Sequence, residues 1–394
     1  MNRAPFLGAR HLLAPPHRGS GAVDVAHALV ALHSTDPASV YLSVAARSGA
    51  AVADVDRALY EDGQLVRLLG MRRTVWVVPA DLVPVVTAAC TRGVAAAERR
   101  KLVRLVEGAA IAPDGPRWLE AAEADALAAV AERGEALGEE VRQAVPALRA
   151  TYSASPGRPY ERTVAIASRV LFQLAADGRI VRGRPRGTWL SSQYRWRLAP
   201  PCEMLDEAAA QAELARRWLA AFGPASAAPA RDLQWWAGWT VAATKRALAS
   251  AGCDGDGIVG SGGGGDQGGG SGGGEGGSGS GGGGGGGARP WAALLPGLDP
   301  TPMGWKEREW YVGAYGPLVF DSTGNVGPTV WWDGRIVGGW RQRPGGEVVT
   351  RVLEDIGRDG EEAVGEQAER LTKWLDGTVV VPRFRSPLDR EPGP

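Results

Sequence analysis

His33 stands in a short polar segment, His33-Ser34-Thr35-Asp36, between two apolar stretches, and the chain has only four histidines. An imidazole can accept a proton or a hydrogen bond from water, and a carboxylate beside it can stabilise positive charge on a reacting carbon. The segment therefore suits the orientation of a water molecule for hydrolysis. The alternative is structural: Ser34, Thr35 and Asp36 cap the following helix, and His33 packs against it.

A basic cluster later in the chain suits a partner that carries phosphate groups. Nine arginines lie between Arg158 and Arg197 against two acidic residues, whereas the whole chain has 44 basic and 44 acidic residues. This local excess attracts phosphates even though the net charge is zero. The alternative is a solvated basic face without a partner.

The elements around His33 follow the order of a winged helix. Asp36 suits a helix N-cap and Pro37 the first helical position, so residues 33–35 are expected to be a tight connection between two helices. Three helices followed by a hairpin is the winged-helix order. The expected elements are helices over 23–32, from Pro37 onward and over 55–62, then strands within 65–78 around a turn at 70–73.

Residues 116–198 repeat this order. A helix over 161–177 is expected to end at Gly178, and it resembles a recognition helix followed by a wing. The wing is expected to have a strand at 179–182, a turn at 183–187 and a return strand at 188–197. The candidate DNA contacts are Arg72, Arg73, Arg169 and, at the tip of the wing, Arg182, Arg184 and Arg186.

The sequence predicts an α+β fold of tandem winged-helix units with a C-terminal antiparallel sheet domain. In a third helical unit Asp232 and Thr240 are expected N-caps, and its wing would fall in a disordered Gly/Ser-rich tract. The C-terminal part is expected to have strands at 311–312, 318–320, 329–332, 335–340 and 378–381, a hairpin turn at 333–334 and a helix at 361–375. The expected divisions are 1–115, 116–200, 201–254, 255–288 and 289–394.

Other features of the sequence exclude several classes of function. The three cysteines form no CxxC pair, and the chain has no P-loop, dinucleotide-binding, HExxH or GxSxG motif. We therefore expect no cofactor and no metal. The chain also has no secretion signal and no run of about 18 uncharged apolar residues. We expect a monomeric, cytoplasmic protein without a membrane segment.

Several stretches together resemble the AlkZ/YcaQ-like family of winged-helix DNA glycosylases, and they span nearly the whole chain except the glycine tract. They are Ala28–Leu42, Gly70–Pro79, Asp177–Gly183, Asp232–Trp239, Leu295–Pro300 and Trp305–Arg308. The resemblance implies three tandem winged helices that form a concave cradle for double-stranded DNA. It also implies hydrolysis of the N-glycosidic bond of bulky alkylated purines or of some interstrand crosslinks.

In that family a Gln-x-Gln or Gln-x-Asp pair positions the hydrolytic water. The matching place here is His33-Ser34-Thr35, followed by Asp36, so both glutamine positions are changed. The resemblance implies His33, Thr35 and Asp36 as catalytic residues. An alkylated purine is a cationic leaving group that needs little acid assistance, so oriented water and negative charge near the anomeric carbon are sufficient.

Three functions remain open at this point. The first is a monofunctional DNA glycosylase. The second is a non-catalytic DNA-binding protein or transcriptional regulator, and the third is a scaffold that responds to a small molecule through the C-terminal sheet. Release of base from an alkylated duplex separates the first two.

Overall fold

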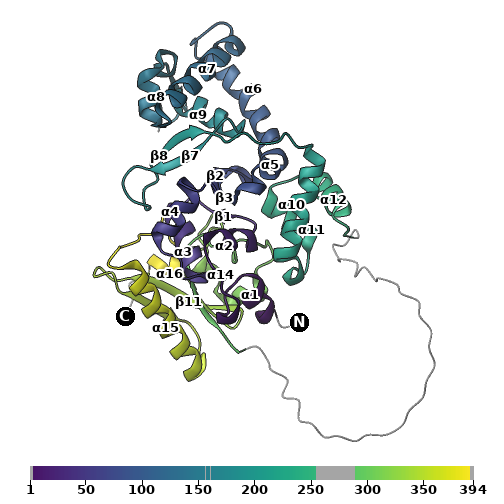
Figure 1. Ribbon diagram of the computed structural model, residues 1–394, viewed down its shortest axis with the longest axis vertical. Helices are drawn as coiled ribbons and strands as arrows, with labels where there is room; N and C mark the ends of the chain where they lie inside the picture. The colour runs from purple at the N-terminus through teal and green to yellow at the C-terminus, as the bar shows by residue number, and fades with distance from the viewer. Residues whose placement is uncertain (1–2, 156, 160, 254–288, 391–394) are drawn as a thin grey trace, which may run out of the picture.

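The computed structural model describes residues 3–155, 157–159, 161–253 and 289–390, which form helices and antiparallel sheets. The Gly/Ser-rich segment expected at 255–288 lies outside the described residues, as does any wing within it. Helices α6 to α9 lie at one end of the molecule and the C-terminal strands and α15 at the other (Figure 1).

The N-terminal elements hold His33 in a strand. They are α1 (Ala4–Arg10), α2 (Ala22–Ala28), β1 (Leu32–His33), α3 (Pro37–Arg47), α4 (Val52–Tyr60), β2 (Leu65–Leu69) and β3 (Val75–Pro79). The expected first helix ends early because Leu32 and His33 pair with Val77 and Trp76 of β3. The prediction of a plain inter-helix connection at 33–35 was therefore wrong at His33. The helix start at Pro37, with Asp36 as its N-cap, is confirmed.

The next region contains a long helical run and a second hairpin. Its elements are α5 (Val83–Val86), α6 (Arg92–Gly108), α7 (Gly115–Arg133), β4 (Glu135–Leu137), α8 (Gly138–Ala144), β5 (Thr151–Ala154), β6 (Arg162–Ala165), α9 (Ala167–Ala176), β7 (Ile180–Pro185) and β8 (Tyr194–Leu198). The helix expected from residue 161 starts only at Ala167, because residues 162–165 pair with β5. The hairpin turn expected at 183–187 lies later, since β7 continues to Pro185.

One six-stranded sheet joins the two hairpins, in the order β1-β3-β2-β7-β8-β4. The link between them is the antiparallel pairing of β2 with β7, where Arg67 lies opposite Arg182. The strands of the two expected wings therefore belong to one sheet. Any motion of the second hairpin is therefore coupled through backbone hydrogen bonds to the strands beside His33.

The remaining elements pack around this sheet. They are α10 (Glu207–Phe222), α11 (Pro229–Ala237), α12 (Val241–Ser250), β9 (Ala292–Leu295), α13 (Glu309–Val312), α14 (Gly316–Val319), β10 (Thr329–Trp332), β11 (Arg335–Gln342), β12 (Val348–Val352), α15 (Gly357–Leu375) and α16 (Pro387–Arg390). Strands β12-β11-β10-β9 form an antiparallel sheet, as expected. Residues 311–312 and 318–319, expected as strands, are in short helices instead; Phe320 forms a single β-bridge with Val326, and residues 378–381 form no strand.

Helix α3 connects the N-terminal and C-terminal parts of the chain. All eleven of its residues are buried. Val40, Tyr41 and Val44 pack with the N-terminal helices, whereas Ala38 and Leu42 pack with the C-terminal sheet and α15. Such burial on all sides fixes α3, and with it the polar segment that precedes α3.

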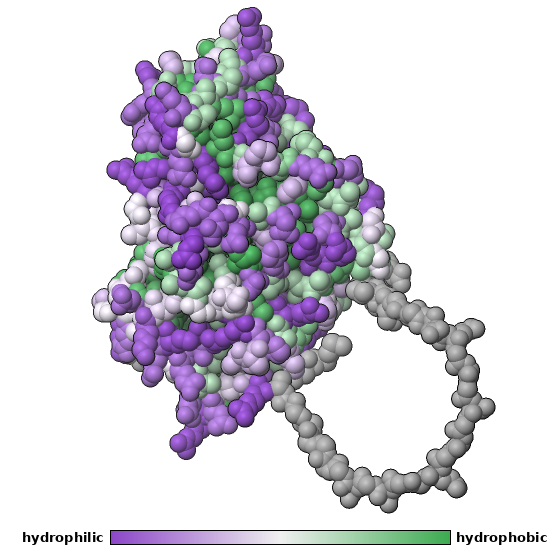
Figure 2. Space-filling model, viewed as in Figure 1, coloured by the Kyte–Doolittle hydropathy of each residue, from purple (hydrophilic) through white to green (hydrophobic). Residues whose placement is uncertain are grey.

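The face in Figure 2 carries mostly hydrophilic residues with smaller apolar areas between them. Among the described residues one helical run, Ala80–Gly108, is long and apolar enough by composition to cross a membrane. Of its most apolar window 44% is buried inside the protein. Val86 and Ala89 of this run belong to the main core with Trp76 and Trp218, which is the environment of a core helix.

Candidate active site and nucleic-acid interface

His33 is held as a neutral imidazole against the sheet. Its ring lies 4.6 Å from the Trp76 ring, its cross-strand partner, and only 5% of the residue is exposed. Burial, with a further contribution from the Arg72 charge, lowers the pKa of His33 to about 3. A group with this pKa is a poor base at neutral pH. His33 is therefore suited to orient water by hydrogen bonding rather than to deprotonate it.

Thr35 lies directly beside His33. The Thr35 backbone N–H donates to Nδ1 of His33 at 3.4 Å, so the neutral ring carries its proton on Nε2. Within the described residues the Thr35 hydroxyl is buried and has no hydrogen-bond partner. Buried hydroxyls are normally paired, so this one has its full capacity for a water or a substrate atom.

Asp36 has the capping role that its position predicts. Its carboxylate accepts from the backbone N–H of Ala38 at 3.2 Å and from that of Arg383 at 2.9 Å. Burial raises the pKa of Asp36, while these two N–H groups and the Arg383 charge oppose the rise. The carboxylate therefore joins the start of α3 to the C-terminal segment, and it lies next in sequence to Thr35.

Ser34 points to the other face of the sheet, as alternation along a strand requires. Its hydroxyl accepts from Nε of Arg67 at 2.8 Å, and Nη1 of Arg67 donates to the Tyr60 hydroxyl at 2.6 Å. Arg67 is 1% exposed and lies over the Tyr194 ring at 4.5 Å. This buried cation therefore holds Ser34, the residue between His33 and Thr35, from the other side of the sheet.

A second buried arginine anchors the far end of α3. Arg47 forms a two-pronged ion pair with Asp299, with N–O distances of 2.8 and 2.7 Å, and Ser43 donates to the same carboxylate. The remaining donors of Arg47 reach the His11 carbonyl and the Thr301 hydroxyl. His11 is itself buried, and burial with the Arg47 charge lowers its pKa to about 3.

The arginines predicted in the first hairpin occupy different environments. Arg72 stacks on the Trp235 ring at 4.2 Å, and it lies close enough to His33 to influence its titration. Arg73, the next residue, is exposed and pairs with Glu98 at 2.9 Å. Arg73 and Arg169 also line one hollow of about 720 Å³. The structure therefore brings Arg72 to His33, and Arg73 to Arg169.

The three arginines predicted at the tip of the second hairpin are not equivalent. Arg182 lies inside β7, over the Tyr194 and Trp196 rings at 5.3 Å each. Arg184 pairs with Glu61 at 2.7 Å. Arg186 alone of the three is exposed and beyond the strand. The placement of Arg182 and Arg184 at the tip was wrong, because β7 is longer than the glycine pattern indicated.

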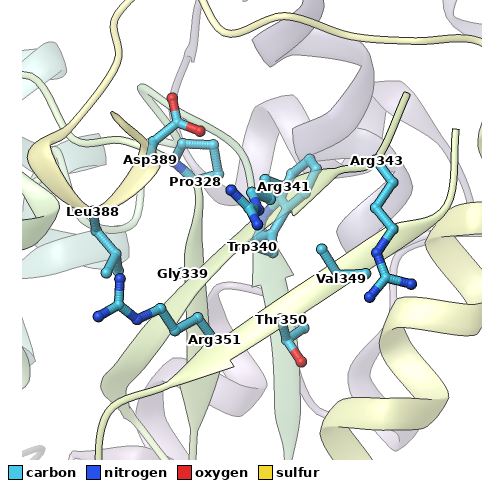
Figure 3. A pocket seen from close by; sticks show the side chains of 10 residues that line it. All are labelled: Pro328, Gly339, Trp340, Arg341, Arg343, Val349, Thr350, Arg351, Leu388 and Asp389. Carbon is cyan, nitrogen blue, oxygen red and sulfur yellow. The ribbon is translucent and has the colours of Figure 1, made fainter. Parts of the chain in front are cut away.

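A different pocket lies on the C-terminal sheet. It has a volume of about 90 Å³ and lies beside β11, β12 and the start of α16, with Trp340, Arg341 and Leu388 in its lining (Figure 3). Its lining includes none of the predicted catalytic or DNA-binding residues. For metal binding, the described residues contain no group of three or more His, Cys, Asp or Glu side chains placed to hold an ion.

Sequence reasoning missed several residues near His33. Arg383 was not selected because it lies in a proline-rich tail about 350 residues away, and only its contacts with Thr35 and Asp36 reveal it. Trp235 packs against the main core and also stacks on Arg72. Asp232 was expected to cap its own helix but lies inside α11, where it accepts from the backbone of Lys306 instead. The Thr240 cap is confirmed.

A family model described as DNA glycosylase AlkZ-like matches residues 26–374, and the chain belongs to this family of DNA glycosylases, enzymes of DNA repair. The fold is similar to that of Streptomyces sahachiroi DNA glycosylase AlkZ, with a TM-score of 0.66 and 16% sequence identity. That similarity covers 98% of this chain and 100% of the other. No curated protein matches the chain.

Proposed function

We propose that this glycosylase hydrolyses the N-glycosidic bond of alkylated or crosslinked purines in double-stranded DNA, with His33, Thr35 and Asp36 at its catalytic centre. The observation that carries the proposal is the buried Thr35 hydroxyl, which has no partner among the described residues and lies beside a neutral imidazole. Those two groups stand at the positions where the family resemblance places its water-positioning pair.

The three residues have separate roles in this proposal. The Thr35 hydroxyl and the His33 ring hold the water by hydrogen bonds and aim it at the anomeric carbon. Asp36 supplies negative charge near the sugar, where positive charge develops as the base departs. The cationic base leaves without a proton from the protein, so a general acid is unnecessary. Because His33 stays neutral, it adds no positive charge of its own to the site.

For the binding surface we propose tandem winged-helix units that form a cradle for the duplex, acting as a monomer in the cytoplasm. The hairpins β2–β3 and β7–β8 are the wings, with α9 as the recognition helix of the second unit, and the third unit and the C-terminal sheet domain complete the cradle. Arg169 and Arg186 are exposed and contact phosphates directly, whereas Arg73 is exposed but paired with Glu98 and contributes mainly through its field. Arg182 and Arg184 contribute to the field from the sheet.

The test uses Thr35, because valine has nearly the same shape but no hydroxyl. We expect Thr35→Val to lower single-turnover base release from a duplex with one N7-alkylguanine by about two orders of magnitude. Duplex affinity and melting temperature stay unchanged. Thr35→Ser, which restores a hydroxyl, retains most of the activity. The readout is the rate at which alkali-labile abasic sites appear with enzyme in excess.

Asp36 provides a second arm of the same experiment. Asparagine keeps the helix cap to Ala38 but cannot also accept from the Arg383 N–H, so Asp36→Asn is expected to lower the melting temperature modestly while base release falls far more. The changed glutamine positions also favour a second function, that of a non-catalytic DNA-binding protein. Wild-type protein that binds the alkylated duplex but releases no base over hours would establish that alternative instead.

A further inference from the structure

The turn that carries Arg72 is built in an unfavourable conformation. Arg72 and Arg73 both have positive φ angles, 52° and 60°, in a place where glycine or asparagine is the usual residue. The turn packs against α11 at Gly238, whose own φ is +76°. A Cβ at Gly238 would lie 3.2 to 3.3 Å from Arg72, so only glycine lets α11 end so close to the turn. Such local strain is concentrated at functional sites.

The side chain of Arg72 is fixed by stacking, and no acid among the described residues forms an ion pair with it. Its guanidinium lies 4.2 Å from the centre of the Trp235 ring, and within the described residues its buried Nε has no hydrogen-bond partner. Arg308 stacks on the same indole at 4.8 Å. Two cations therefore share one aromatic ring, and the charge of one of them, Arg72, acts on His33.

The acids of this region are engaged with other groups. Asp232 accepts from the Ser226 hydroxyl at 2.5 Å and from the backbone N–H groups of Lys306 and Glu307. Glu307 pairs with Arg231 at 2.6 Å. Burial, and secondly the charge of Arg308, lowers the pKa of Arg72 to about 10. An incoming anion relieves this repulsion between the two guanidinium groups, and it receives donors that are already oriented.

We infer that Arg72, Trp235 and Arg308 form a binding site for one phosphodiester group of the damaged DNA strand. The inference rests on the proposed function, because that phosphate belongs to the nucleotide whose sugar reaches His33 and Thr35. The bound phosphate also neutralises Arg72. The cation beside His33 then no longer opposes the positive charge that develops on the sugar, so binding at this site prepares the field for base release.

Arg72 and Arg73 form a matched pair for the test, since they share the turn and its positive φ but Arg73 is already paired with Glu98. Arg72→Gln and Arg73→Gln are compared with wild type for binding to an undamaged 20-base-pair duplex over a series of salt concentrations. Each phosphate contact contributes about 0.9 to the slope of log K against log salt. We expect Arg72→Gln to lose about one such unit and to weaken binding about tenfold at physiological salt.

Arg73→Gln is expected to change the slope by less than half of that amount. Arg72→Lys keeps the charge but loses the planar stack, so it recovers the salt slope while base release remains below wild type. Melting temperatures show whether each variant is folded. An Arg72→Gln protein that is folded and keeps the wild-type slope and affinity overturns the phosphate site.

The same measurements separate this inference from the proposed function. If wild type releases no base but its duplex affinity depends on Arg72 as described, the phosphate site stands and the catalytic proposal fails. If base release is robust and Arg72→Gln leaves both binding and release unchanged, the catalytic proposal stands and the phosphate site is wrong.

Discussion

Arg47, at the far end of α3, and Arg72, whose charge acts on His33, differ in how their charge is balanced. Arg47 has a bidentate carboxylate partner, two carbonyl acceptors and a hydroxyl, and it is completely buried. Arg72 has an aromatic face and, within the described residues, a buried Nε without a partner. A satisfied buried charge has no capacity left for a ligand, whereas an unsatisfied one retains it.

The comparison separates stability from binding. The contacts of Arg47 join α3 to α1 and to the loop around Asp299. Loss of the Arg47 ion pair should therefore destabilise the fold without a specific effect on DNA binding. The environment of Arg72 joins the first hairpin to α11 and contributes little pairing energy of its own. Substitutions of Arg72 should therefore affect DNA binding more than folding.

The largest expected effect follows from breaking the Arg47 ion pair. Asp299→Asn leaves a buried guanidinium without its counter-charge, which costs about 3 to 5 kcal/mol of unfolding free energy. Urea denaturation followed by tryptophan fluorescence measures this loss. The double variant Arg47→Met with Asp299→Leu should recover the part of the loss that comes from the unpaired charge, but not the part from the His11 carbonyl and the Ser43 and Thr301 hydroxyls, which lose their partners. A salt slope of DNA binding that changes in the double variant would contradict the structural role of this pair.

A smaller effect is expected from pH, through His33 and His11. Both pKa values are lowered to about 3 from 6.5 by burial, so the unfolded chain takes up protons that the folded protein does not. The full stability is present above pH 6.5. Below it, each histidine removes about 1.4 kcal/mol per pH unit, which amounts to about 2 kcal/mol for each between pH 6.5 and pH 5.

The measurement compares wild type with His33→Gln between pH 7.5 and 5, because all other titrating groups then cancel. The two curves of unfolding free energy against pH should converge as pH falls, since the variant lacks one of the two histidine contributions. Base release by wild type should show no inflection near pH 6.5, where an ordinary imidazole titrates. A clear inflection there that disappears in His33→Gln would show that His33 is accessible to protons and acts as a base.

The smallest expected effects belong to the second hairpin. Arg186→Gln should weaken duplex binding about threefold, as expected for one exposed charge at the rim of an interface. Arg184→Gln should have less effect because Glu61 already balances that charge. Arg182→Gln should lower the melting temperature instead, since it removes a cation from the Tyr194 and Trp196 rings. Equal losses of affinity in all three variants would contradict the distinction between a paired, a packed and an exposed arginine.

Local rules of the chain were sufficient for much of the architecture. Asp36-Pro37 predicted the start of α3, Thr240 the N-cap of α12, and Gly178 the end of the helix before β7, because capping depends on neighbouring residues only. The hairpin turn at Asp333-Gly334 is local in the same way. The predictions were wrong where pairing with a distant segment decides the structure. β1 forms because it pairs with β3, and residues 162–165 form a strand because they pair with β5.

The same division holds for the candidate site. The sequence by itself determined the type of chemistry, since an imidazole, a hydroxyl and a carboxylate follow one another in His33, Thr35 and Asp36. Only the tertiary structure decided that the imidazole is neutral, that Asp36 is tied to Arg383 and that Arg72 of the first hairpin, rather than an arginine of the second hairpin, acts on His33. The physical reason is that desolvation and charge pairing depend on which distant segments are brought together, and no local pattern contains that information.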